Sequence, residues 1–430
     1  MLTRSCIGNA TFDVCVKVNA VSVRSINTNS SDVEKSERSL QPEVSKFPSP
    51  GAAALRKGTG GRSSFNGTVC TVFGATGFLG RILCNKLGKI GTQLIIPFRK
   101  DPYDVRALKV MGDLGQVLFF PFYLRNEESI YKTMKYSNVV INLIGKDIET
   151  PSFTYDEVHV EGARMLARVA RQAGVQRFIH VSALNSSPNP KQHTWFAKGG
   201  SQFLKTKYYG EVAVREEFPE ATILRPADMF GLEDRFLNYY HRFSRNKIPN
   251  NAIWLWNRGL GTYKQPVYVG DVAQGIVNAI YDPEAPGKTY DCVGPKRYEL
   301  LEIVRYIKNI TQREEEFGFT IGDLRHHPLF YLRVKFFSYI WHHNMSQLCT
   351  DKVERESVSD ELIPGNLTLE DLGVNLSPME NYAMLELRPK RRHAFYCETI
   401  DELPIPAHPR TVEPLIAAKY ASREFKQATV

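Results

Sequence analysis

The sequence has no long apolar run and no closely spaced cysteines. No stretch approaches the ~18 uninterrupted apolar residues that a membrane-spanning helix requires, so no integral membrane segment is predicted. The seven cysteines stand singly, without a CxxC pair or a Cys/His cluster at zinc-finger spacing. This pattern is typical of buried thiols in a reducing compartment, and it predicts neither a metal site nor disulfides.

The length and charge of the chain exclude further classes. A chain of 430 residues with 43% hydrophobic and 23% charged residues is able to bury a sizeable core, which excludes a wholly disordered or fibrous protein. Its length suggests roughly two to three domains. Lys and Arg outnumber Asp and Glu by 55 to 46, which gives a net charge of +9. This excess favours anionic partners without choosing between a phosphate cofactor, a lipid headgroup, nucleic acid and an acidic protein.

Residues 1–66 differ in composition from the rest of the chain. Ser, Asn, Thr, Gly and Pro dominate, and the first part carries a single acid, Asp13, against Arg4, Lys17 and Arg24. An acid-poor, Arg-bearing and Ser-rich segment is typical of a mitochondrial transit peptide. The same composition also fits an ordinary disordered tail. We expect a disordered leader over residues 1–66 that includes a transit peptide.

Apolar strands alternate with helical stretches from residue 67 onward. Short runs rich in β-branched or aromatic residues lie at residues 69–73, 94–98, 117–120, 139–144, 177–182 and 221–225. The segments between them have helical periodicity, most clearly residues 160–173. This alternation predicts the α/β fold class, with a doubly wound parallel sheet covered on both faces. We expect it to occupy residues 67–320, together with a smaller C-terminal lobe.

A glycine motif directly follows the first predicted strand and opens the first predicted helix. Its sequence is Gly74-Ala75-Thr76-Gly77-Phe78-Leu79-Gly80. The first glycine allows a sharp turn, the second lets the backbone approach a pyrophosphate, and the third permits close contact between helix and strand. The phosphates then meet the unpaired amides and the positive dipole end of the helix. In this βαβ setting the motif predicts a bound dinucleotide.

Two arginines indicate which dinucleotide the chain prefers. The second predicted strand ends before Arg99, where cofactors without a 2′-phosphate usually meet an Asp or Glu. A guanidinium instead suits a phosphate, and Arg81 follows the glycine motif as a second cation. The pattern favours NADP(H) over NAD(H), and the alternative is that both are solvated surface arginines.

Further motifs follow the glycine motif in a characteristic order. They are Asn142-Leu143-Ile144-Gly145, His180-Val181-Ser182, residues 225–231 (RPADMFG) and residues 266–273 (PVYVGDVA). With them the chain resembles the extended or atypical short-chain dehydrogenase/reductases. Within that superfamily it is similar to the family of NADPH-binding accessory subunits of mitochondrial respiratory complex I. The similarity covers residues 67–295 closely and the C-terminal part more loosely.

The resemblance implies a Rossmann fold that binds NADPH as a structural cofactor, through all seven residues of the glycine motif. It further assigns cofactor contacts to the following residues: Arg81, Arg99, Leu143, Ile144, Gly145, Ser182, Lys207 and Pro226. Lys207 is expected to donate a hydrogen bond to the nicotinamide ribose.

The catalytic position of the superfamily is altered in this chain. Active members need a Tyr that exchanges a proton with the substrate oxygen, and a Lys four residues later on the same helical face. Lys207 occupies the lysine position, but the tyrosine position holds Phe203, whose ring has no ionisable proton. Ser182 is present, whereas the next position, often a hydroxyl, is Ala183. Together these departures predict no catalytic residues and a lost hydride-transfer chemistry.

The regular alternation ends near residue 320, and residues 321–430 are predicted to form an extended, partly helical tail for partner contacts. Residues 330–341 combine aromatic and basic side chains. Such a segment suits a membrane interface, a neighbouring subunit or the protein's own core. Residues 388–393 form a basic cluster that suits anionic lipid, acidic protein or solvent. No RNA-binding pattern is visible, so no nucleic acid is expected as a partner.

Three functions follow, of which the resemblance favours the first. It implies a non-catalytic accessory subunit of complex I that holds NADPH structurally and supports assembly and stability of the complex. Its partners would be other subunits, with anionic lipid contact by the tail, and its place would be the matrix side of the mitochondrial inner membrane as a peripheral protein. The alternatives are an active NADPH-dependent atypical short-chain reductase or epimerase, and an RNA-associated or sensor protein of this fold.

Overall fold

The computed structural model describes most of the chain between residues 58 and 412. The described residues are 58, 60–99, 101–195, 199–241, 252–311, 320–326, 330–332, 334, 349–363, 365–391 and 406–412. The predicted transit peptide and most of the leader lie outside the described residues, as do most of residues 330–341.

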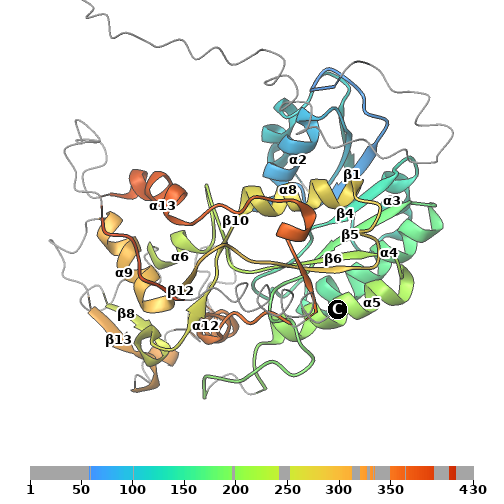
Figure 1. Ribbon diagram of the computed structural model, residues 1–430. Helices are drawn as coiled ribbons and strands as arrows, with labels where there is room; N and C mark the ends of the chain where they lie inside the picture. The colour runs from blue at the N-terminus through green and yellow to red at the C-terminus, as the bar shows by residue number, and fades with distance from the viewer. Residues whose placement is uncertain are drawn as a thin grey trace, which may run out of the picture. The chain divides into compact units, whose positions relative to one another are not determined.

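Eight parallel strands form the central sheet, in the order β14-β11-β6-β5-β4-β1-β2-β3 (Figure 1). They are β1 (Val69–Phe73), β2 (Gln93–Phe98), β3 (Val117–Pro121), β4 (Val139–Asn142), β5 (Arg177–Val181), β6 (Thr222–Pro226), β11 (Thr289–Cys292) and β14 (Leu367–Thr368). The order reverses beside β1, because β2 lies on one side of it and β4 on the other. The predicted doubly wound sheet is thus confirmed. Folds of this kind bind ligands at the carboxyl ends of the strands beside such a reversal.

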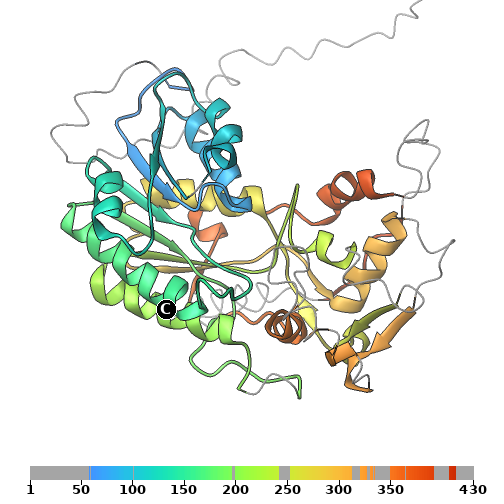
Figure 2. The ribbon, with the colours of Figure 1, turned by 180° about the vertical axis from the view of Figure 1, so that it is seen from behind.

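Helices cover both faces of the sheet, as Figures 1 and 2 show from opposite sides. On one face lie α2 (Phe78–Lys89) and α8 (Val269–Tyr281), which share a buried core that includes Leu83 and Ile276. The other face is covered by α3 (Glu127–Met134), α4 (Gly162–Gln172) and α5 (Gln202–Glu217). A π-helical turn at Glu157–Glu161 precedes α4. Burial on both faces explains why the strands are nearly continuous apolar runs.

A smaller lobe with its own core lies beyond the sheet. It contains α6 (Leu237–His241), α9 (Leu300–Thr311), α12 (Thr350–Ser357), α13 (Glu380–Leu387), and the paired strands β8 (Ala252–Leu255) with β13 (Thr320–Asp323) and β7 (Met229–Phe230) with β10 (Val267–Tyr268). A three-stranded sheet joins β9 (Tyr263–Lys264), β12 (Arg297–Glu299) and β15 (Thr411–Val412). Short 3₁₀ helices lie at Pro102–Val110, Trp256–Gly259, Leu324–His326, Glu370–Leu372 and Arg388–Lys390. The core of this lobe includes Phe236, Ile303 and Ile307.

Part of the C-terminal segment, which we predicted to be an extended, partly helical tail for partner contacts, packs against the rest of this chain. In the described residues 349–363 and 365–391, β14 is the edge strand of the central sheet, and α13 shares the core of the smaller lobe with α9. The physical reason is specific packing: Leu369 is fully buried, and its Cδ2 lies where a side chain on Gly275 would stand. The domain boundaries themselves stay predictions.

The described residues contain no helix that is both long and apolar enough to cross a membrane. In the same part of the chain, no group of His, Cys, Asp and Glu side chains could hold a metal ion. Cys70, Cys84, Cys292 and Cys349 are buried free thiols.

Candidate functional site

The glycine motif forms a tight loop between β1 and α2. Gly74 has φ +83°, and a Cβ there would lie 3.1 Å from the carbonyl carbon and oxygen of Leu143 at the end of β4. A Cβ on Gly80 would lie 2.5 Å from the carbonyl oxygen of Gly74 and 2.6 Å from Cα of Ala75. Only glycine fits at either place, because the first needs a left-handed backbone and the second has no room for a side chain. The loop therefore presents backbone without bulky side chains at the start of α2, as a phosphate site requires.

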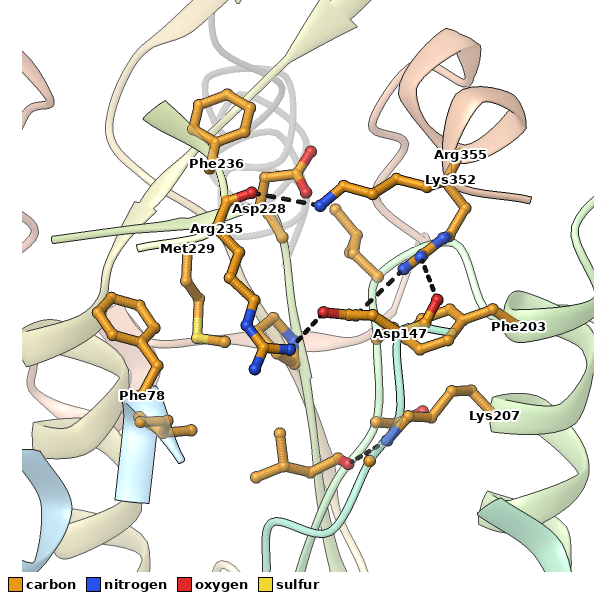
Figure 3. A pocket seen from close by; sticks show the side chains of 18 of the residues that line it. Phe78, Asp147, Phe203, Lys207, Asp228, Met229, Arg235, Phe236, Lys352 and Arg355 are labelled. Carbon is orange, nitrogen blue, oxygen red and sulfur yellow. Dashed lines mark hydrogen bonds and ion pairs between the residues drawn. The ribbon is translucent and has the colours of Figure 1, made fainter. Parts of the chain in front are cut away.

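A cavity of about 340 Å³ opens at this loop and runs between the sheet and the smaller lobe (Figure 3). Most of the predicted cofactor residues line it, namely Gly74, Gly77, Phe78, Leu79, Gly80, Leu143, Gly145, Ser182, Lys207 and Pro226. The remaining ones, Ala75, Thr76, Arg81, Arg99 and Ile144, do not. Ala75 is buried in the core, and the Thr76 side chain is exposed. The structure thus gathers ten of the fifteen predicted residues on one cavity.

The two predicted phosphate-binding arginines have different surroundings. Nη2 of Arg81 lies 2.5 Å from Oε2 of Glu233, which already neutralises its charge. Arg99 has no ion pair among the described residues, and its guanidinium carbon lies 5.7 Å from the ring centroid of Phe153. Arg99 is therefore the better placed of the two for a phosphate.

Two more cations surround the ring of Phe153. The guanidinium carbon of Arg125 lies 4.6 Å and Nζ of Lys146 5.4 Å from its centroid. Arg125 is paired with Glu157 at 2.9 Å. Burial and then the charge of Arg99 lower the pKa of Lys146. The cations therefore repel one another, and an anion beside them would relieve that repulsion.

Ser182 and Lys207 mark the opposite end of the cavity. Both side chains are 5% exposed. Nζ of Lys207 donates to the carbonyl oxygen of Val181 at 3.2 Å, and burial lowers its pKa to about 8. Oγ of Ser182 has no hydrogen-bond partner among the described residues. A buried hydroxyl without a partner costs free energy, so its place on the cavity wall suits a polar ligand group.

Phe203 lies beside Lys207, where the superfamily would place a proton-donating Tyr. Its ring is 8% exposed, lines the cavity, and has Nζ of Lys207 5.9 Å from its centroid. Tyr155 and His159 pack edge-on against it, at centroid distances of 6.1 and 5.2 Å. The hydroxyl of Tyr155 donates to the carbonyl oxygen of Asp147 at 2.8 Å, and burial raises its pKa. The phenol of Tyr155 is thus committed to a structural hydrogen bond.

A group of charged side chains that sequence reasoning missed closes the far wall of the cavity. Asp147 follows β4, Arg235 precedes α6, and Lys352 and Arg355 belong to α12. Nη1 of Arg235 lies 2.7 Å from Oδ2 of Asp147, and Nη1 of Arg355 lies 3.7 Å from Oδ1. The only sequence signal is the i,i+4 spacing of Asp351 and Arg355, which is common on solvated helices.

The carboxylate at the centre of this group stays ionised. Burial alone would raise the pKa of Asp147, but Arg355, Lys352 and Arg235 together hold it well below its usual range. Asp147 in turn raises the pKa of Arg355 against the effect of burial. The wall of the cavity therefore carries a permanent network of opposite charges.

Known proteins are similar to this chain in sequence and in fold. Residues 70–292 match the model of the NAD dependent epimerase/dehydratase family. A mouse protein, NADH dehydrogenase (ubiquinone) 1 alpha subcomplex subunit 9, mitochondrial, is 44% identical over 360 residues, which are 81% of this chain and 88% of the mouse protein. The chain belongs to this family of NADH dehydrogenase subunits.

A fungal relative and a solved structure are also similar to the chain. The NADH-ubiquinone oxidoreductase 40 kDa subunit, mitochondrial, of Neurospora crassa is 38% identical over 338 residues, covering 78% of this chain and 83% of its own. The crystal structure of gox2253 is 16% identical, covers 76% of this chain and all of its own, and superposes with a TM-score of 0.55. This last likeness shows the fold alone.

Proposed function

We propose that the chain is a non-catalytic accessory subunit of mitochondrial complex I that holds NADPH as a structural ligand. The observation that carries the proposal is Phe203, which lines the cavity beside Lys207 and offers no proton. Bound NADPH supplies a hydride at its nicotinamide ring, but reduction of a carbonyl also needs a proton donor at the substrate oxygen. In this proposal the cleft has residues that can bind a dinucleotide, but at position 203 it lacks the proton donor that carbonyl reduction needs.

The cavity supports a dinucleotide through residues at both ends. The loop at Gly74 and Gly80 has no room for side chains, so backbone amides at the start of α2 would hold the pyrophosphate. The unpartnered hydroxyl of Ser182 and the ammonium of Lys207 would hold the nicotinamide ribose. Leu143, Gly145 and Pro226 supply the wall between the two ends.

The cations at the end of β2 support NADPH rather than NADH. Arg99 has no counter-ion among the described residues, and Lys146 lies against the same ring. A 2′-phosphate would supply the missing negative charge. The ribose of NADH carries no such charge, and no carboxylate follows β2 directly to bind its hydroxyls.

The names of the relatives support an association with complex I in mitochondria. Both are named as mitochondrial subunits of the NADH-ubiquinone oxidoreductase, and this chain matches most of their length. We infer that the chain contacts other subunits of that complex on the matrix side of the inner membrane. A bound NADPH would stabilise the folded subunit by mass action, and so support assembly and stability of the complex.

The decisive measurement is the identity and amount of nucleotide that the purified full-length chain releases on denaturation, by mass spectrometry. We expect NADPH at close to one equivalent. The same preparation, incubated with small aldehydes, ketones and nucleotide sugars, should leave the NADPH absorbance unchanged. Substrate-dependent oxidation would instead establish the reductase or epimerase alternative, and a chain that neither carries nor takes up nucleotide would refute the structural-ligand role.

A separate experiment tests the assembly role. Cells that lack their own subunit of this family are complemented with the full-length chain, and complex I is resolved on native gels. We expect the chain to migrate with assembled complex I and to restore its amount. Migration of the chain alone, without recovery of the complex, would contradict the accessory role even if the nucleotide is present.

A further inference from the structure

Helix α12 brings an arginine into the cavity at the place where chemistry would occur. The guanidinium carbon of Arg355 lies 3.9 Å from the ring centroid of Phe203, which is the closest cation–ring contact described. Figure 3 shows the two side chains together, with Lys207 beyond the ring. A guanidinium at this distance stacks on the aromatic face and excludes other groups from it.

Carboxylates from both sides hold Arg355 there. Its Nη1 lies 3.7 Å from Oδ1 of Asp147, and its Nη2 donates to the carbonyl oxygen of Asp147 at 3.3 Å. Its Nε lies 3.2 Å from Oδ2 of Asp351, one helical turn earlier on α12. Three contacts and a ring face leave the side chain little freedom to swing away.

The same ion pairs join the two sides of the cleft. Asp147 follows β4 of the central sheet, whereas Arg235 and Arg355 come from the smaller lobe. The cavity lies between them and is lined by all three residues. Separation of the two sides therefore requires that Asp147 lose both arginines at once.

The position of Arg355 has a direct chemical consequence. A carbonyl substrate must place its oxygen at the proton donor and its carbon at the nicotinamide. On the proposed function, the ring of Phe203 occupies the donor position, and the nicotinamide would lie beside Ser182 and Lys207. The guanidinium of Arg355 already covers the ring, so the space for a substrate is taken by a residue of the protein itself.

We propose that Arg355 closes the nicotinamide end of the cleft, excluding substrates and, through Asp147, retaining the bound nucleotide. The inference rests on the proposed function, because it presumes NADPH in the cavity. It assigns a role to α12, which lies outside the residues 70–292 that match the family model. Arg355 is a positioning and retaining residue, and takes no part in a reaction.

The test uses the purified full-length chain loaded with NADPH, and compares wild type with Arg355→Ala. Release is followed by NADPH fluorescence after addition of excess NADP⁺, and access to the nicotinamide by acrylamide quenching of the bound NADPH. We expect release to be about tenfold faster or more, because loss of one partner of a half-buried charge pair beside the ligand acts mainly on dissociation. Quenching should rise toward the value for NADPH in solution.

Arg355→Ala is expected to fold, because the two carboxylates that lose Arg355 keep other partners. Asp147 retains Arg235 at 2.7 Å, and Asp351 retains the hydroxyl of Ser201 at 3.0 Å. Arg355→Lys is the second variant, since it keeps the charge but loses the planar fork, and it should fall between wild type and Arg355→Ala. Arg305→Ala is the matched control, because Arg305 is an exposed arginine of α9 that pairs with Glu302 on the same helix.

The outcomes separate the two claims. Release and quenching that are the same in wild type, Arg355→Ala and Arg355→Lys would overturn the inference alone. If Arg355→Ala does not fold, Arg355→Lys decides by the same two measurements. A wild-type chain that takes up no NADPH would overturn the proposed function, and this inference with it.

Discussion

At the scale of single residues, the two arginines near the predicted phosphate positions differ in what they already contact. Arg81 is neutralised by Glu233, whereas Arg99 has no ion pair among the described residues. On sequence grounds Arg99 was the predicted phosphate ligand and Arg81 a second cation nearby, because sequence shows which residue follows a strand but not which carboxylate folds back onto it. Glu233 is 152 positions away from Arg81.

The first prediction follows from that difference. Arg99→Gln should weaken NADPH binding by about 1.5–3 kcal/mol, which is the usual value of a hydrogen bond to a charged group, and should leave NADH binding unchanged. Arg81→Gln is the control, and its effect should be below about threefold, because a surface pair contributes little. Isothermal titration with both nucleotides measures the change. If Arg81→Gln were the variant that lost the preference, Glu233 would have to release its arginine on binding.

Other residues of the cleft show the same limit of sequence reasoning. Phe203 and Lys207 were placed correctly on one face of a helix, because their spacing of four residues fixes that relation. Asp147, Arg235 and Arg355 were missed, because they lie in three segments that only the fold brings together. Local spacing thus indicated that Phe203 and Lys207 share a helical face, but not which side chain lies over the ring of Phe203.

At the scale of elements, sequence reasoning succeeded with buried strands and failed with short ones. The runs that became β1 and β4 are apolar and β-branched, so their pattern indicates a strand without further information. Strand β14 has two residues, Leu367 and Thr368, and no periodicity that a sequence could show. It is a strand because β11 presents an open edge beside it.

The buried carboxylate of Glu354 joins helix α12 to the loop before α5. Glu354 is 0% exposed and accepts from the backbone N–H groups of His193 and Thr194 at 2.5 and 2.9 Å, and also from the hydroxyl of Thr194. The exposed side chain of Glu361, four residues after the end of the helix, pairs with Lys191 of that loop. The loop before α5 is thus tied to α12 through the buried Glu354, and to the segment after α12 through the exposed Glu361.

The second prediction compares those two acids. Glu354→Ala should lower the free energy of unfolding by about 3 kcal/mol, because three donors lose a charged acceptor in a buried site. Glu361→Ala should cost at most about 0.5 kcal/mol, since exposed pairs contribute little. Urea unfolding followed by circular dichroism provides both values. Equal losses would mean that α12 does not depend on the buried acceptor.

At the scale of the whole molecule, buried histidines make stability depend on pH. The backbone N–H of Lys146 donates to Nε2 of His159 at 3.1 Å, so this nitrogen carries no proton, and Nδ1 donates to Thr206 at 2.9 Å. Burial, followed by the charges of Lys207 and Arg355, lowers the pKa of His159 to about 2. Burial and Lys207 lower the pKa of His180 to about 3. Both imidazoles are neutral in the folded chain.

The last prediction concerns acid. In the unfolded chain these histidines have a pKa near 6.5, so the unfolded state takes up protons first and the free energy of unfolding falls as the pH drops below that value. Between pH 7 and 5.5 the two should cost about 2 kcal/mol together. In His159→Gln the loss should be smaller by about 1 kcal/mol. Urea unfolding at both pH values measures these losses, and an unchanged loss in His159→Gln would show that the folded chain protonates this histidine.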